Sequence, residues 1–435
     1  MGESTPMDRR SFLRSALAGA GTLALGDSLV RAAFAGEATD ADKSSYGELK
    51  HPDLNGLQYP RGFQGRVIAR SGVPVGLTPY VWPAFPDGSA CFANDPGWIL
   101  VVNSENPPAV DVSLAPEVQD LMGGASAIVF DSTGKITDAY SILRGTRTNC
   151  AGGVTPWDTW LSCEEFDYTT PGRIPGAATS DAGRVWECSP TDRGGKSARE
   201  VPMLGKFKHE AATFDDEGCV YLTEDMPDGC FYRFTPTGVG EGSASLDVGV
   251  LQALIHASTQ GPVTWTDPLD PTALATSLRV QATAKGATSF NGGEGCFYAD
   301  GVVLFTTKGD DKVWALNVNT QQIEVLYDGT RAGSVLTGVD NIIVSPRTGN
   351  IYVAEDGGNM EVVVIETDDK GRTAAPLARA TGPQHGVTNP SPIPTASEVV
   401  GLALSPDSTR LYFSGQRTFG VGITYELKAP VGTFF

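Results

Sequence analysis

The residues best suited to chemistry lie between positions 148 and 165, which read Thr-Asn-Cys-Ala-Gly-Gly-Val-Thr-Pro-Trp-Asp-Thr-Trp-Leu-Ser-Cys-Glu-Glu. Cys150 offers a soft thiolate ligand, and Glu164 or Glu165 offers hard carboxylate oxygens. The Gly-Gly pair after Cys150 allows the backbone to come close to whatever the segment binds. The segment therefore predicts a metal site.

Three further glutamates stand where a ligand is expected. Glu294 is isolated among glycines in Gly-Gly-Glu-Gly-Cys, an arrangement that favours a backbone bent closely around a bound group. Glu210 follows His209, and because neighbours on a strand face opposite sides, we expect Glu210 to point into the site and His209 to support it from outside. An ion pair between Glu210 and a lysine is the alternative. Glu105 follows the strand-like run 98–102.

The elements that must position these side chains are short strands. Fifty-two glycines and 29 prolines separate runs rich in Val, Tyr, Phe and Thr. One phrase recurs, an apolar residue followed by a turn with Asp, Asn or Gly and then a strand, and it starts at Phe130, Phe214, Phe297, Val344 and Leu404. The repeat predicts an all-β fold, a β-propeller with inserted loops and short helices. A two-sheet β-sandwich is the competing architecture.

In a propeller the innermost strands converge on a central channel, so polar residues far apart in sequence meet there. Carboxylates stand at the ends of several predicted strands, where they could reach this channel. Glu224-Asp225 and Glu355-Asp356 each follow a strand, and Asp340 opens one. We expect residues 36–435 to form a single propeller domain. Residues 235–290, which are poorer in strand signals, are predicted to be an insertion with a short helix.

Several functional classes are excluded by absent motifs. The chain has no Gly-x-Ser-x-Gly elbow and no phosphate-binding Walker loop, and its four histidines share no zinc spacing. The formal net charge of −19 argues against nucleic-acid binding. The seven cysteines are an odd number, so at least one is expected to stay unpaired. Cys150 is the candidate for that thiol, and Cys219 and Cys230 could pair across the strand between them.

The first 35 residues indicate export. Asp8-Arg-Arg-Ser-Phe-Leu-Arg14 is a twin-arginine pattern, an apolar run from Ser15 to Leu25 follows it, and Ala33-Phe-Ala35 offers a cleavage site. We therefore expect residues 1–35 to be a signal peptide read by the twin-arginine export machinery, and the mature protein to be periplasmic or extracellular. No other stretch suggests a stable membrane span.

Together these motifs resemble the PhoX-type alkaline phosphatases. The resemblance covers nearly the whole mature chain and is carried by Thr148-Asn-Cys-Ala-Gly-Gly-Val-Thr-Pro-Trp, Thr159-Trp-Leu-Ser-Cys-Glu-Glu, Gly205-Lys-Phe-Lys-His-Glu-Ala, Val220-Tyr-Leu-Thr-Glu-Asp, Phe231-Tyr-Arg-Phe, Gly293-Glu-Gly-Cys and Val339-Asp-Asn-Ile. It implies a six-bladed propeller whose channel mouth holds Fe(3+) and Ca(2+). We expect the protein to be a monomer. By the same resemblance, Cys150 bridges the irons.

The resemblance also implies roles for the carboxylates. Glu165, Glu210, Glu294 and Asp340 would share the iron and calcium ions, with Glu105 as a further ligand, and Glu294 would be the catalytic residue. Hard cations prefer such oxygen ligands. Such a cluster would bind a small-molecule phosphate monoester through its oxygens and neutralise charge in the transition state.

This chain departs from the family at one position. The family has an arginine two residues before the glutamate of its Glu-Gly motif, where this chain has Gly292. A bidentate guanidinium is therefore missing there, and the candidates to replace it are Lys285, Lys308 and Arg233. The alternative function is a metal-binding propeller without phosphomonoesterase activity, or one that acts on another ester such as a phosphodiester or a lactone.

Overall fold

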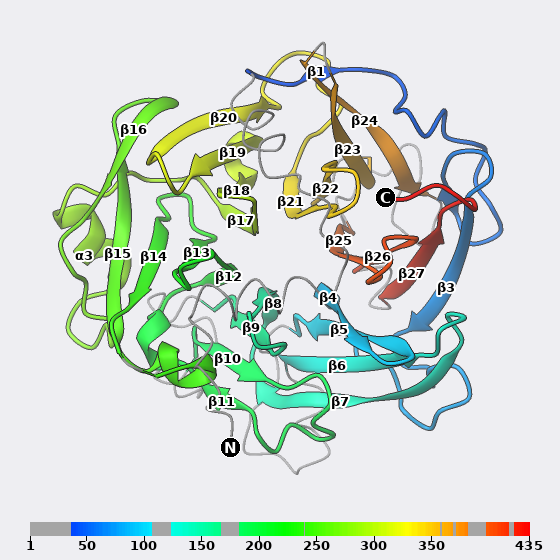
Figure 1. Cartoon of the computed structure of the whole chain (residues 1–435), viewed down its shortest axis with the longest axis horizontal. Coiled ribbons are helices and arrows are strands. Elements are labelled where there is room, and N and C mark those ends of the chain that lie inside the picture. The colour runs from blue at the N-terminus through cyan, green and yellow to red at the C-terminus, as the bar shows by residue number, and fades with distance from the viewer. Residues whose placement is uncertain are drawn as a thin grey trace, which may run out of the picture.

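The computed structural model describes residues 36–106, 123–166, 182–238, 240–356, 359–368, 371–381, 397–416 and 422–435. Within these ranges the chain forms a β-propeller, as the sequence predicts, with six blades around a central axis (Figure 1). The predicted signal peptide, residues 1–35, lies outside the described residues.

Each blade is a four-stranded antiparallel sheet. From the innermost strand outwards, blade 1 consists of β4 (Pro86–Asn94), β5 (Gly97–Ser104), β6 (Gly123–Phe130) and β7 (Ile136–Thr146), and blade 2 of β8 (Asn149–Val154), β9 (Trp160–Glu164), β10 (Val185–Cys188) and β11 (Arg199–Glu200). Blade 3 consists of β12 (His209–Phe214), β13 (Val220–Glu224), β14 (Phe231–Pro236) and β15 (Gly249–His256), and blade 4 of β17 (Gly293–Ala299), β18 (Val302–Thr307), β19 (Lys312–Asn317) and β20 (Gln322–Asp328). Blade 5 consists of β21 (Val339–Val344), β22 (Ile351–Glu355), β23 (Glu361–Asp368) and β24 (Gly371–Ala380), and blade 6 of β25 (Val399–Leu404), β26 (Arg410–Gly415), β27 (Ile423–Lys428) and β3 (Gln64–Arg70).

The sixth blade closes the ring. Its outer strand, β3, comes from the N-terminal side of blade 1 and pairs antiparallel with β27, with Arg70 opposite Ile423 and Gln64 opposite Lys428. Two short strands, β1 (Thr39–Asp40) and β2 (Leu57–Gln58), add to β24 at the edge of blade 5. Strands from both ends of the described chain therefore share one part of the ring.

The core lies between neighbouring blades, because each sheet is covered on both faces. All of β18 is buried, and its first four residues form a continuous apolar run, as expected for a strand packed on both sides. Aromatic rings fill the contact between blades 3 and 4, where Phe305 stacks on Phe231 with 4.2 Å between ring centroids. Blade-to-blade packing of this kind fixes the positions of the innermost strands.

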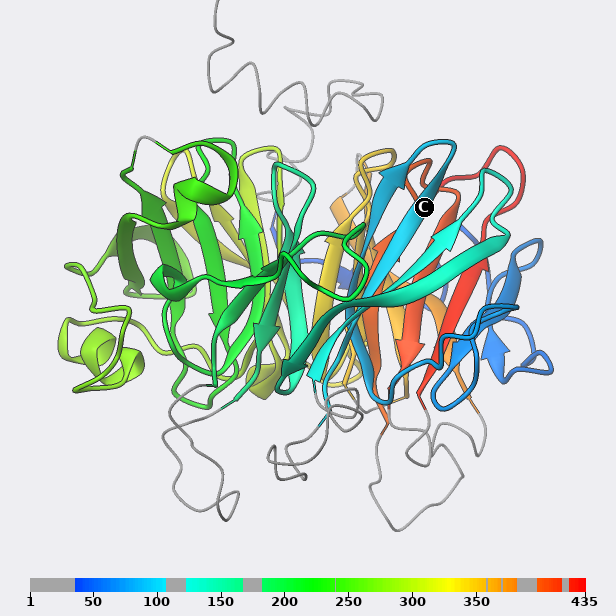
Figure 2. The same cartoon turned by 90° about the horizontal axis from the view of Figure 1, so that it is seen from below.

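The range 235–290, predicted to be an insertion, contains an integral strand. β15 is the outer strand of blade 3, and β16 (Gln260–Trp265) then bridges it to β20 of blade 4. The expected short helix is α3 (Leu278–Ala284), which lies on the outer flank of the ring (Figure 2). The strand signal of β15 was missed because the apolar run of its sequence is short.

All seven cysteines are free thiols, so the pairing of Cys219 with Cys230 that the sequence left open does not form. Cys230 is buried in the apolar core of blade 3, whereas the half-buried Cys219 lies beside the Thr235 hydroxyl. Among the described residues, none of the helices has the length and apolar character that crossing a membrane requires.

The innermost strands approach one another so closely that some positions admit only glycine. A Cβ atom on Gly153 of blade 2 would lie 1.9 Å from the carbonyl oxygen of Ala212 in blade 3. We therefore expect Gly153→Ala to lower the free energy of unfolding by about 1–3 kcal/mol, because the backbones must separate. Gly238→Ala is the control, since its Cβ would meet Val248 at an ordinary 3.4 Å. Equal denaturant midpoints for the two variants would contradict this prediction.

Candidate metal centre

The second residue of each innermost strand occupies the same place in every blade. Each innermost strand shows a shift in its pairing register, as a β-bulge gives, and the shift begins at the first or second residue of the strand. A β-bulge redirects the side chain next to it. The residues at this position, called the inner set, are Asp87, Cys150, Glu210, Glu294, Asp340 and Val400. Five of the six blades thus contribute an acid or a thiol.

A second set of side chains comes from the residue directly after the second strand of each blade. The last residue of the second strand pairs with the first residue of the innermost strand, so both sets lie at the same end of the ring. This rim set consists of Glu105, Glu165, Asp225, Lys308, Asp356 and Gln416. The inner set is buried, whereas every rim residue except Gln416 is partly exposed.

Three groups of side chains within these sets have ligand atoms that all lie within 4.8 Å of one another. The groups are Asp87, Glu105 and Cys150; Cys150, Glu165 and Glu210; and Glu210, Glu294 and Asp340. Cys150 and Glu210 each belong to two groups and therefore connect the three. All six residues that the sequence singled out as ligands are brought together here, and Asp87 joins them.

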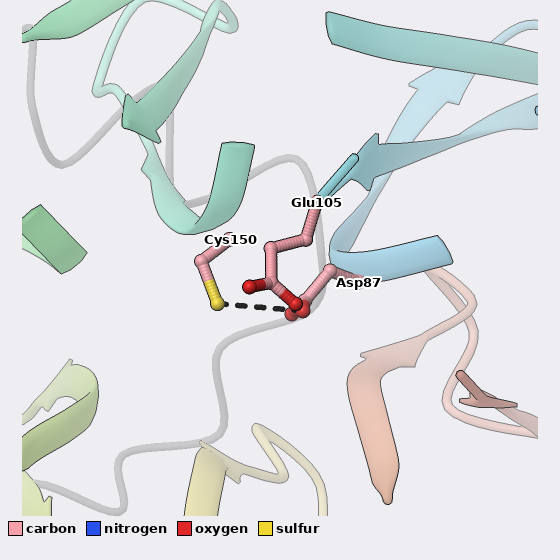
Figure 3. A group of neighbouring side chains, drawn as sticks. All are labelled: Asp87, Glu105 and Cys150. Carbon is pink, nitrogen blue, oxygen red and sulfur yellow. Dashed lines mark hydrogen bonds between the residues drawn. The ribbon is translucent and has the colours of Figure 1, made fainter. Parts of the chain in front are cut away.

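Asp87 was missed by the sequence reasoning. Its side chain, with those of Glu105 and Cys150, points into one space between blades 1 and 2 (Figure 3). The Cys150 thiol donates a hydrogen bond to Asp87 Oδ2 at 3.3 Å, and the Gln416 amide donates to both Asp87 and Glu105. Burial, followed by the charges of Asp87 and Glu210, raises the pKa of Cys150 well above 9.0. A cation at this position would reverse that effect and favour the thiolate.

Glu210 is a carboxylate at the centre of the three groups, since it belongs to two of them. It is fully buried, and neither of its carboxylate oxygens has a hydrogen-bond partner. Burial and the nearby charges of Glu294 and Glu165 raise its pKa well above 4.5. The lysine ion pair considered as the alternative for Glu210 does not form, because the lysines of the cluster contact other carboxylates.

His209 faces away from Glu210, as expected for strand neighbours. Its ring stacks on Phe207 with 3.5 Å between centroids, and Nε2 lies 3.3 Å from the carbonyl oxygen of Gly205. Burial lowers the pKa of His209 to about 3, so the ring is neutral. Of the two glutamates at 164 and 165, Glu164 accepts hydrogen bonds from the backbone nitrogens of Arg147 and Arg184, and Glu165 belongs to the cluster.

Two lysines lie among the rim carboxylates. Lys208 Nζ is 2.6 Å from Glu165 and 2.5 Å from Asp225. Lys308 Nζ is 2.7 Å from Glu294, 3.1 Å from Asp356 and 3.7 Å from Asp225. Burial raises the pKa of Asp225, but the charges of Lys308 and Lys208 outweigh it and lower the pKa to about 2.

Of the three candidates for the cation missing at Gly292, only Lys308 reaches the cluster. Arg233 stacks on the Trp265 ring at 4.1 Å, and Lys285 donates to the carbonyl oxygen of Pro268. Gly292 has a φ of +69°, and a Cβ there would lie 3.2 Å from Asp225 Oδ1. An arginine would therefore be strained at this position.

The donor set suits metal ions. A buried carboxylate without a partner is costly in a folded protein unless a cation balances it, and Glu210 is such a group. One thiol among many carboxylates combines a soft ligand with hard ligands, which fits a transition metal next to oxygen-preferring cations. Glu210, Cys150 and their neighbours can thus hold several cations in adjacent positions.

Comparison with known proteins gives a match to a family model and a similar fold. Residues 118–324 match the model of the family described as alkaline phosphatase PhoX. PhoX of Pseudomonas fluorescens, solved in complex with vanadate, a transition state analogue, has 16% sequence identity, with 87% of this chain and 97% of that chain covered and a TM-score of 0.67. A gluconolactonase from Xanthomonas campestris is less similar, with 12% identity, 90% and 100% covered and a TM-score of 0.43. A search of curated proteins gave no match.

Proposed function

We propose that this chain, whose residues 118–324 place it in the PhoX family of alkaline phosphatases, hydrolyses phosphate monoesters at a metal cluster in the propeller channel. The observation that carries the proposal is the buried Glu210, which lacks any partner and connects two groups of converging ligand atoms. The match of fold to a phosphatase solved with a transition state analogue supports it.

We assign the cluster to Fe(3+) and Ca(2+). Cys150 is the soft ligand, which suits iron, with Glu165 and Glu210 beside it. Glu210, Glu294 and Asp340 form an all-oxygen group, which suits calcium. Asp87 and Glu105 complete the third group, which also includes Cys150. When bound, these ions would supply positive charge to the phosphoryl oxygens and activate water.

The side chains themselves supply position and proton transfer. Glu294 is the proposed catalytic residue, because it lies at the boundary between the buried inner set and the rim, with Oε1 2.7 Å from Lys308 Nζ. Burial raises the pKa of Glu294 well above 4.5, which makes its carboxylate a stronger base. Val400, the sixth member of the inner set, places an apolar side chain at the position where the other blades have ligands.

We further propose that the protein acts as a monomer outside the cytoplasm, exported by the twin-arginine machinery through residues 1–35. A folded and metal-loaded protein is a suitable cargo for that route. The formal net charge of −19 is in keeping with a protein that binds cations rather than nucleic acid.

The test is metal analysis of protein purified from the exported fraction, followed by assay. We expect bound iron and calcium, and turnover of p-nitrophenyl phosphate that stops after removal of the metals with a chelator and returns when they are restored. Iron and calcium without turnover of the monoester would refute the phosphatase function. Faster turnover of a phosphodiester or a lactone would favour the alternative ester, and absence of iron would refute the cluster.

A further inference from the structure

The two lysines of the cluster stand between the solvent and the buried carboxylates. The side chains of Lys308 and Lys208 are 33% and 19% exposed, whereas that of Glu294 is 3% exposed. A solute that enters from the rim therefore meets the ammonium groups before the buried acids.

The lysines are not placed to neutralise the deepest negative charge. Glu210 remains without a hydrogen-bond or ion-pair partner, although it is fully buried and costly to leave charged. Instead, the ammonium groups contact the rim carboxylates Glu165, Asp225 and Asp356, and Lys308 also contacts Glu294 at the boundary. Neutralisation of the cluster thus accounts for only part of their position, because Glu210 is left without a cation.

Asp225 brings the two ammonium groups together. Its Oδ2 atom lies 2.5 Å from Lys208 Nζ and 3.7 Å from Lys308 Nζ, so both cations meet at one oxygen. One tetrahedral anion can contact two ammonium groups that are this close. Lysine acts as a point charge towards phosphate and does not need the planar geometry of a guanidinium.

The backbone holds Lys308 against the glycine at 292. The Lys308 amide donates to the Gly292 carbonyl at 2.7 Å, and the next amide, Gly309, donates to the Asn291 carbonyl at 2.9 Å. Because Gly292 has no side chain, the space beside Asp225 is left to the Lys308 side chain. The positive charge beside Asp225 therefore comes from Lys308, which directly follows β18, and not from residue 292.

We propose that Lys308 and Lys208, held together by Asp225, bind the phosphoryl group of the substrate on the rim side of the metal centre. The proposal rests on the phosphatase function and names its anion-binding residues. Two charge-assisted contacts to a dianion favour phosphate monoesters, with two negative charges, over phosphodiesters, with one. The lysine pair therefore acts on substrate choice as well as on affinity.

The experiment measures the binding of inorganic phosphate to metal-loaded protein by calorimetry, with iron and calcium contents determined for every variant. We expect Lys308→Met and Lys208→Met each to weaken phosphate binding about tenfold or more, as for the loss of a charged hydrogen bond. Lys308→Arg, which keeps the charge, should recover most of the affinity. Lys285→Met is the matched control and should bind phosphate like the wild type, because that lysine lies outside the cluster.

Unchanged phosphate affinity in Lys308→Met and Lys208→Met would overturn the proposal. It would also fail if the loss of affinity followed a loss of bound metal, since the lysines would then serve only the metal ligands. Because the readout is binding, it is separate from the phosphatase function. If the protein hydrolyses no monoester but both variants bind phosphate more weakly, the phosphatase function is refuted. The assignment of the two lysines as the phosphate-binding residues is then still supported.

Discussion

Glu210→Gln should abolish catalysis and at the same time stabilise the metal-free protein. We expect kcat/KM to fall by more than about 100-fold, since even residues that only support a metal ligand contribute 10- to 100-fold to affinity or activity. The metal-free variant should gain at least about 1 kcal/mol of unfolding free energy, because the amide removes a buried charge that has no partner. Activity assays and denaturant unfolding, each with and without metals, check both effects.

The same substitution should change how stability depends on pH. Because the pKa of Glu210 is raised in the folded state, the unfolded chain releases this proton first as the pH rises above 4.5. The metal-free wild type should therefore lose stability as the pH rises from about 4.5 towards the folded pKa, and Glu210→Gln should lose less. A metal-free variant that is less stable than the wild type at pH 8 would contradict this account.

Glu187→Gln is the matched control for Glu210→Gln. Glu187 is also a buried glutamate, but it accepts hydrogen bonds from Trp157 and Thr159 and pairs with Arg199 at 2.8 Å. Loss of its charge should therefore destabilise the protein by about 1–3 kcal/mol with and without metals. Metal content and activity per folded molecule should stay at the wild-type level.

Cys150→Ser should remove iron and leave the fold intact. The serine hydroxyl can still donate to Asp87, as the thiol does at 3.3 Å, but it is a poor soft ligand. We expect the iron content to fall to near zero, with activity lost in parallel. Elemental analysis and the visible absorption of an iron–thiolate bond measure the effect.

Cys296→Ala provides the comparison for Cys150→Ser. Cys296 lies on β17, two residues after Glu294, and is buried in an apolar cluster. Its loss should lower stability without changing the iron content. A Cys150→Ser protein that keeps its iron would show that the thiolate is not a ligand.

Iron loading should also depend on pH through Cys150. Without metal, burial and neighbouring carboxylates hold the thiol protonated, so binding must release a proton. Loading should therefore be faster and tighter as the pH rises.

The sequence predicted most of the residues that converge at the candidate site, because they lie at strand ends. Cys150, Glu210 and Glu294 stand in glycine-rich or strand-opening motifs, and a propeller necessarily brings such positions together. The carboxylates that follow second strands, Asp225 and Asp356, were also recognised as channel residues. What carried these predictions was the repeat of an apolar residue, a turn and a strand.

Asp87 was missed because its sequence context is misleading. It lies in Pro86-Asp87-Gly88, a sequence typical of a turn, whereas the structure makes it the second residue of an innermost strand. A comparison of strand openings across all blades would have found it, since Asp340 occupies the same place in blade 5. Lys308 was one of three cations that the sequence offered for this place, whereas Lys208 was not singled out, because its contacts with Glu165 and Asp225 form only in the folded chain.

The pairing of β3 with β27 sets the order of events during biosynthesis. Blade 6 needs a strand made before blade 1 and strands made after blade 5, so the ring cannot close while the later strands are still being synthesised. Until then, Asp87 of blade 1 and Asp340 of blade 5 have no fixed distance between them. The candidate ligands therefore reach their final positions together and only after translation. Under the proposed function, metal insertion would then be a single late step, and it would report that folding is complete before export.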